Sequence, residues 1–341
     1  MPSAMPSWRE AVLDGVKEAA RLHEQLGLRT QIEATPGSID VFSAIVQLNI
    51  PLLFRPLDGL LGTFLPKPSP GIIVTTERSL AVQRFTGAHE LGHCYMGHEI
   101  SLDKKSILKR FPFGSRSYDP REAAADAFAA SFLLPKWLLE IHAARHRWNA
   151  RALHDPLIVY QLSLRLGTSF DATCRSLKQH GIIGADVMDR LIGIKPKKIK
   201  QEILQRYEMD DWHPDVWLLT EADSATRIQG GPDDVFVLKL QENSGAGYLW
   251  NLEDLEAAGF AIVADNRHIP NHDEEVGGVV ERVLTARLNE PERGRSGLIS
   301  LNETRPWAED EPPADQLTLI YDLYGKELGQ PRAERHRLAA A

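Results

Sequence analysis

The residue pattern of the chain changes near Tyr207, and this change constrains the fold more than any other feature. Before this point, apolar residues recur mainly at helical spacing; after it, short runs rich in β-branched and aromatic residues alternate with turn residues. Strand-sized runs at this spacing are typical of a sandwich. These runs cover residues 235–240, 261–263, 279–288, 297–302 and 317–323. The sequence therefore predicts an α+β chain with an all-β, immunoglobulin-like C-terminal part.

Charge changes at the same point. Between Glu208 and Asp234 there are eight acidic residues and one basic residue, Arg227. The whole chain has 47 acidic and 39 basic residues, which argues against a basic surface for direct binding of nucleic acid. Two cysteines cannot form a disulfide framework, and no apolar run reaches the roughly 18 residues of a membrane span. We therefore expect a cytoplasmic protein that does not bind membranes.

The helical part before Tyr207 divides into two predicted units. The first combines helices with a small sheet: helices at 8–26, 38–47, 80–97 and 120–142, and strands at 50–54, 60–65 and 71–75. In the second, short helices at 157–165, 169–179 and 184–191 resemble a helix-turn-helix bundle. The basic run Lys195–Lys200 is either a solvated linker or a phosphate contact. The predicted domains are 1–150, 151–207 and 208–326, followed by a frayed or helical tail at 327–341.

The segment His89-Glu90-Leu91-Gly92-His93 is the most informative motif. Two histidines four residues apart on a helix lie on one face, so both rings can offer a nitrogen to one metal ion. Glu90 follows the first histidine and can reach a water on the metal, which is the spacing used by zinc peptidases. We therefore predict a site for Zn²⁺, with Mn²⁺ as the alternative in the cell.

A catalytic zinc ion needs a third protein ligand and an open position. Glu122 lies on the next strong helix, and Asp126 lies one turn further on the same face. The residues around them are poor in charge, which indicates a buried role for the two acids; a solvated stripe on an amphipathic helix is the alternative. We predict that Glu122 binds the metal and that Asp126 accepts the N–H of His89 or His93.

The reaction also needs a donor to the oxyanion. Tyr118, four residues before Glu122, is the first candidate, and His98 is the second. Tyr118 could instead pack in the interior, and His98 could be exposed at the end of its helix.

The two motifs, from Arg84 to His93 and from Glu122 to Pro135, resemble those of the ImmA/IrrE-type metallopeptidases, and the resemblance covers about residues 10–190. It implies a zincin-like, gluzincin-like core in which His89, His93 and Glu122 bind the metal and Glu90 is the general base. Asp126 stands where the family often has Asn. The resemblance also implies a cytoplasmic protease that cuts a transcriptional repressor, often a helix-turn-helix protein, in a stress, mobile-element or defence response.

Three turn-rich loops of the predicted sandwich, at 243–250, 275–278 and 305–307, resemble those of the chagasin-type inhibitors of papain-like cysteine peptidases. This resemblance covers about residues 213–325. It implies a sandwich whose partner-binding loops contain Asn243, Gly247, Tyr248, Trp250, Gly277, Gly278, Arg305, Pro306 and Trp307. The chain departs from the family at the loop tips, where Gly245 and Ala246 replace two threonines and Glu275 replaces a glycine. Such a domain could recruit a substrate or a protein partner, or could plug the groove of the peptidase itself.

Three functions are compatible with these patterns. The first is a zinc-dependent metalloendopeptidase with a protein-recognition domain. The second is a protein-binding or peptidase-inhibitor protein whose peptidase core is degenerate. The third is a DNA-binding regulator acting through residues 157–192, which the acidic balance opposes. The complete ligand set and Glu90 favour the first function, because an inactive core has no need of the base.

Overall fold

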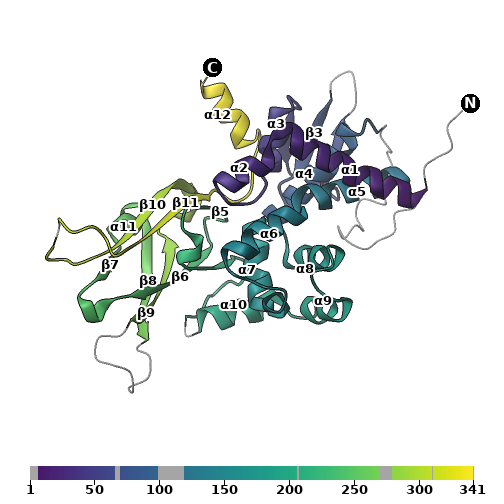
Figure 1. The fold of residues 1–341 in the computed structure, drawn as a ribbon. Coiled ribbons are helices and arrows are strands. Elements are labelled where there is room, and N and C mark those ends of the chain that lie inside the picture. The colour runs from purple at the N-terminus through teal and green to yellow at the C-terminus, as the bar shows by residue number, and fades with distance from the viewer. Residues whose placement is uncertain are drawn as a thin grey trace, which may run out of the picture.

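The computed structural model describes residues 7–65, 70–98, 119–205, 207–268, 279–308 and 310–340. Helices with a small sheet form one side of the molecule, and a β-sandwich forms the other (Figure 1). The architecture is therefore α+β, as predicted. Among the described helices, none is long and apolar enough to cross a membrane.

In the described residues, the first half consists of six helices around a three-stranded sheet. The helices are α1 (Trp8–Leu26), α2 (Leu28–Ala34), α3 (Val41–Gln47), α4 (Leu80–Tyr95), α5 (Pro120–Leu133) and α6 (Lys136–Arg145). The strands are β1 (Leu52–Arg55), β2 (Gly62–Leu65) and β3 (Gly71–Thr75). The sheet has the order β1-β3-β2, with β1 parallel and β2 antiparallel to β3. Helix α5 packs against both α1 and α4, so it is buried on two sides.

The sequence predicted one helix over 120–142, and this prediction is wrong. The helix stops at Leu133, and α6 begins after Pro135, which occupies its N-cap. Proline disfavours helical geometry at the residue before it and has no N–H for the helical ladder. Leu134 accordingly adopts a non-helical conformation (φ −128°, ψ 50°). The helix is therefore interrupted at Leu134 and Pro135.

Four short helices follow: α7 (Pro156–Leu166), α8 (Phe170–Gln179), α9 (Ala185–Ile192) and α10 (Pro196–Leu204). The basic run Lys195–Lys200 lies at the start of α10, so it is not a solvated linker. Ile199 and Ile203 are buried on the inner face of this helix. Lys200 is also buried, and its Nζ donates to the carbonyl oxygens of Trp212 and Pro214 at 3.0 and 2.8 Å. Its charge therefore holds the chain that leads into the sandwich.

The sandwich consists of two four-stranded sheets, ordered β5-β11-β10-β7 and β4-β6-β9-β8. The strands are β4 (Val216–Leu219), β5 (Thr226–Gln229), β6 (Val235–Glu242), β7 (Leu249–Asn251), β8 (Phe260–His268), β9 (Val280–Leu288), β10 (Arg295–Thr304) and β11 (Asp315–Leu323), with the short helix α11 (Glu253–Ala257) after β7. The predicted β-rich runs lie in strands, except that β9 begins at Val280 and not at Val279. Strands β4 and β5 have four residues each and were not predicted.

A buried ion pair joins the helical half to the sandwich. The Arg165 side chain on α7 is 3% exposed, and it donates to both carboxylate oxygens of Asp223, at 2.9 and 2.8 Å. Burial raises the pKa of Asp223, but the Arg165 charge outweighs burial and lowers this pKa to about 2. Arg165 also donates to the carbonyl oxygen of Leu218 at 2.8 Å. The guanidinium therefore ties α7 to two segments of the sandwich.

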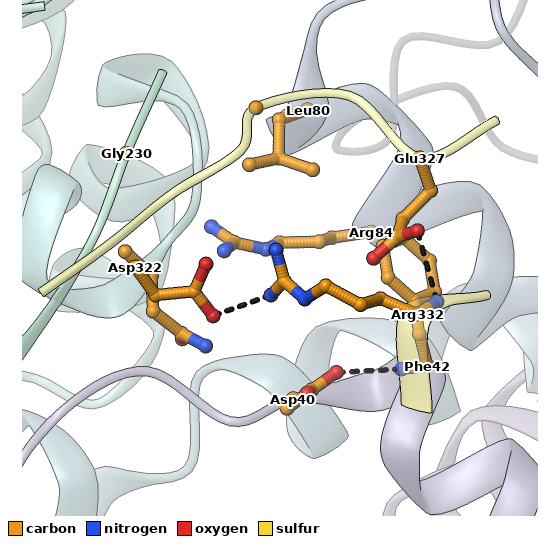
Figure 2. A pocket seen from close by; sticks show the side chains of 10 residues that line it. Asp40, Phe42, Leu80, Arg84, Gly230, Asp322, Glu327 and Arg332 are labelled. Atoms are coloured by element: carbon orange, nitrogen blue, oxygen red, sulfur yellow. Dashed lines mark hydrogen bonds and ion pairs between the residues drawn. The ribbon is translucent and has the colours of Figure 1, made fainter. Parts of the chain in front are cut away.

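After β11 the chain returns to the first half. Phe54 of β1 and Gly329 exchange two backbone hydrogen bonds, at 2.7 and 3.1 Å, and helix α12 (Arg332–Ala340) packs on α3. Figure 2 shows Arg84 of α4 beside Asp322 and Arg332, around a cavity of about 30 Å³. The tail is thus an ordered connection between the sandwich and the helix that carries the histidine motif.

The ion pair gives a testable stability effect. Arg165→Leu leaves the Asp223 carboxylate buried without its cation, so we expect a loss of about 3–5 kcal/mol of unfolding free energy. Urea unfolding of the whole chain, followed by tryptophan fluorescence, measures this loss. Arg175→Leu is the matched control: its pair with Asp171 is partly exposed, and it should cost less than about 1 kcal/mol. Equal losses of unfolding free energy in the two variants would contradict the assignment of Arg165 and Asp223 as a buried, stabilising ion pair.

Candidate metal centre

The close contact of α4 with α5 brings the motif residues together. His89 and His93 lie one turn apart on α4, and Gly92 lies between them in sequence. A Cβ atom on Gly92 would be 3.0 to 3.2 Å from side-chain atoms of Phe128 on α5. The absence of a side chain at Gly92 therefore lets α5 approach the histidine face of α4.

Helix α5 begins where its first turn faces the two histidines. Asp119 is the N-cap and accepts the backbone N–H of Arg121 at 2.9 Å, and Pro120 occupies the first helical position. Glu122 lies in this first turn, where the helix dipole favours a carboxylate. Asp126 follows one turn later.

Three potential ligand atoms converge between the helices. Nε2 of His89 lies 3.0 Å from Nε2 of His93, and Oε2 of Glu122 lies 3.4 and 3.6 Å from these two nitrogens. Bonds of about 2.0–2.1 Å to a tetrahedral zinc ion place its ligand atoms roughly 3.3–3.4 Å apart. The donor types and their spacing therefore fit one divalent metal ion, with the fourth position left for water or substrate.

The other nitrogen of each histidine has its own partner. Nδ1 of His89 lies 2.8 Å from Oδ1 of Asp126. Nδ1 of His93 lies 3.0 Å from Nδ1 of His98. The sequence left open which histidine Asp126 contacts, and the geometry selects His89. Both rings therefore direct Nε2 towards Glu122.

The charges of the site are strongly coupled. Burial lowers the pKa of His89, but hydrogen bonds to Asp126 and Glu122 outweigh it and raise this pKa to about 10. Burial raises the pKa of Glu122, but the two histidines lower it well below the usual range. Burial and the nearby His93 lower the pKa of His98 to about 4, so its ring is neutral near pH 7. Without a metal, one proton is shared within the group formed by His89, His93 and Glu122. A metal ion must displace this proton in order to bind.

Glu90 is close to the group but points towards the sheet. Its side chain is buried, and burial raises its pKa above the ordinary value. Strand β2 passes beside it: a Cβ on Gly62 would lie 2.5 Å from Thr86 and 3.4 Å from Cγ of Glu90. A buried carboxylate with a raised pKa, next to the histidine pair, has the properties of a general base.

The predicted partner-binding residues of two sandwich loops lie together. Arg305 lies over the ring of Tyr248, with its Cζ 4.4 Å from the centroid, and Nε of Arg305 donates to the carbonyl oxygen of Ala246 at 3.2 Å. A Cβ on Gly247, whose φ is +83°, would lie 2.5 Å from the Trp307 ring. Pro306 and Trp307 are exposed, and Trp307 is 72% exposed. The two loops therefore form one surface.

Other residues of these loops face inward. Trp250 is buried, and its Nε1 donates to the carbonyl oxygen of Gln241 at 2.8 Å. Asn243 donates through its backbone N and its Nδ2 to the fully buried carboxylate of Glu303. Glu303 was not among the predicted site residues; it lies at the end of β10, just before the predicted loop that begins at Arg305. Tyr118, Gly277 and Gly278 lie outside the described residues.

Comparison with known proteins agrees with both resemblances. Residues 46–178 match the family model of the IrrE N-terminal-like domain (Peptidase_M78), and residues 232–321 match that of the chagasin family peptidase inhibitors (I42). Among curated proteins, none matches the chain. The first half is therefore similar to a peptidase family, and the sandwich is similar to a peptidase-inhibitor family.

Two solved structures are similar to this chain over about a third of its length. The cysteine protease inhibitor EhICP2 from Entamoeba histolytica is 23% identical, covers 33% of this chain and 99% of its own, and has a TM-score of 0.28. Amebosin, solved in solution, is 19% identical, covers 32% of this chain and 98% of its own, and has a TM-score of 0.23.

The coupled charges predict pH-dependent metal binding. The pKa of His89 is raised, so its protonation stabilises the metal-free fold below pH 6.5, and this contribution is lost as the pH rises through about 10. Zinc affinity should therefore rise about tenfold per pH unit between pH 7 and pH 9, as one proton is displaced. Competition with a chromophoric chelator measures this slope.

Asp126→Asn is the control for this measurement. The variant keeps an acceptor for His89 but removes the negative charge, so the pKa of His89 should fall. The rise of zinc affinity with pH should then be less steep between about pH 7 and pH 9. A parent protein whose zinc affinity does not change with pH would contradict the coupling.

Proposed function

We propose that this chain is a zinc-dependent metalloendopeptidase that cuts a protein substrate, and that its sandwich recognises a protein. The convergence of His89, His93 and Glu122 carries this proposal, because two imidazoles and one carboxylate at this spacing suit a catalytic zinc. The match to a peptidase family over the same segment supports it.

Each residue of the site has a proposed role. His89, His93 and Glu122 hold the ion, and Asp126 orients His89. A zinc ion in this place supplies Lewis-acid activation of water and of the scissile carbonyl. Glu90 takes the proton from the attacking water and returns it to the leaving amine. Its raised pKa suits both steps, because the group must accept a proton and later release it. Tyr118 remains our candidate for the oxyanion donor.

The sheet suggests how a substrate is held. Strand β2 is at an edge of the sheet and pairs with β3 on one side. The opposite edge, at β1, is partly covered by Gly329. Because β2 passes next to Glu90, an extended peptide added to this edge would lie beside the base. Such a peptide would form main-chain hydrogen bonds with β2, and binding of this kind suits a protein substrate.

The sandwich loops are proposed to bind a partner rather than to block the peptidase site. The loop between β10 and β11 is at the end of the sandwich away from α4 and α5 (Figure 1). Exposed Trp307 and the pair formed by Arg305 and Tyr248 provide an aromatic surface of the type that anchors proteins. The match to the chagasin family is the reason to expect a protein there.

We further propose that the substrate is a cytoplasmic transcriptional repressor, such as a helix-turn-helix protein, cut in a stress, mobile-element or defence response. Likeness to the ImmA/IrrE-type peptidases supports this choice. The alternative function is a protein-binding or peptidase-inhibitor protein with a degenerate core, which the chagasin match favours.

Glu90→Gln distinguishes these functions. The amide keeps the size of the side chain but cannot take a proton, so cleavage should fall at least about 100-fold while zinc content is unchanged. Zinc-loaded parent and variant are incubated with a panel of purified helix-turn-helix repressors and with a proteome-derived peptide library. Mass spectrometry then identifies the new termini.

Two results would contradict the proposal. New termini that are equally abundant with Glu90→Gln would come from a contaminating protease. Absence of cleavage by the zinc-loaded parent on both probes would favour the alternative. In that case, retention of proteins by the parent and its loss in Trp307→Ala would assign the function to the sandwich.

A further inference from the structure

A left-handed turn follows α4, the helix that carries the histidine motif. Helix α4 ends at Tyr95, and Gly97 adopts φ +66°, a left-handed conformation that glycine enters without strain. The backbone N–H of Gly97 donates to the carbonyl oxygen of Cys94, and that of His98 donates to the carbonyl oxygen of His93, at 3.2 and 3.0 Å. This C-cap turns His98 back along the last turn of the helix.

His98 contacts His93 at Nδ1, which is not the nitrogen that faces His89. The two Nδ1 atoms are 3.0 Å apart, and the rings are nearly edge to face, with centroids 5.1 Å apart. Nε2 of His93, in contrast, is 3.0 Å from Nε2 of His89. One nitrogen of His93 therefore faces the proposed metal position, and the other faces His98.

The contact selects the tautomer of His93. A nitrogen that binds a metal must be unprotonated, so the proton of a neutral His93 ring resides on Nδ1. Two nitrogens 3.0 Å apart need one donor and one acceptor. Nδ1–H of His93 is then the donor, Nδ1 of His98 is the acceptor, and the proton of His98 lies on its Nε2.

We propose that His98 is a positioning residue that fixes the ring orientation and tautomer of His93 for metal binding. It does for His93 what Asp126 does for His89, using a neutral acceptor in place of a carboxylate. The inference rests on the proposed metal site. This positioning role differs from that of an oxyanion donor, because the acceptor nitrogen of His98 faces His93, a proposed metal ligand.

Three variants of the full chain test this role. His98→Leu keeps bulk but removes the acceptor. His98→Asn places a carbonyl oxygen close to the position of Nδ1 and restores an acceptor. His154→Leu, at an exposed position, controls for the loss of a histidine elsewhere. Zinc dissociation constants come from competition with a chromophoric chelator, stoichiometry from elemental analysis, and stability of the metal-free proteins from thermal unfolding.

We expect His98→Leu to bind one zinc ion 10- to 100-fold more weakly than the parent, on the order found when such supporting groups are removed. His98→Asn should recover most of the affinity, and His154→Leu should bind like the parent. The metal-free variants should unfold at similar temperatures, so that the loss is not one of folding.

Other outcomes overturn the inference. Unchanged affinity in His98→Leu, or equal weakening in His98→Asn, would remove the acceptor role while leaving the zinc site and the proposed peptidase intact. Complete loss of zinc in His98→Leu would make His98 a ligand instead. A parent protein that binds no zinc would end both this inference and the proposed function.

Discussion

The contact between α4 and α5 is the interaction on which the candidate centre depends. The two histidines come from one helix and Glu122 from the other, so the three atoms meet only if the helices approach closely. Small side chains make this possible: Gly92 leaves room for Phe128, and a Cβ on Gly15 of α1 would lie 2.1 Å from the carbonyl oxygen of Ala124 on the other side of α5. Because α5 is packed on both sides, its acids are held among apolar neighbours, where their interaction with the histidines is strong.

The second constraint is the attachment of the sandwich. Arg165 and Lys200 donate to backbone carbonyl oxygens of the sandwich and of the segment before it, and the tail returns to pair with Phe54. These contacts are buried or paired over several segments, so the sandwich is firmly joined to the helical half. The loop between β10 and β11 lies at the end of the sandwich away from α4 and α5 (Figure 1). The surfaces proposed for partner recognition and for peptide cleavage are therefore separate.

Local patterns predicted the parts of this structure that depend on neighbours in sequence. The spacing of His89 and His93 sets their common face on a helix, and a charge-poor stretch around Glu122 indicates burial. Sequence patterns did not predict the features that depend on contacts between residues far apart in the sequence. The basic run that begins at Lys195 resembled a linker because nothing local reveals the carbonyl oxygens that Lys200 meets. The acceptor of His93 depends on a left-handed turn at Gly97, whose direction the sequence alone does not specify. Strands as short as β4 and β5 carry too few residues for a periodic signal.

We propose that α4 and α5 together hold one divalent ion. The most direct test of this proposal is the metal content of the purified chain, measured by elemental analysis after equilibration with zinc and removal of the excess. We expect about one zinc ion per chain in the parent, about one in the exposed-site variant His154→Ala, and none in His93→Ala. Zinc that persists in His93→Ala, or its absence from the parent, would contradict the account.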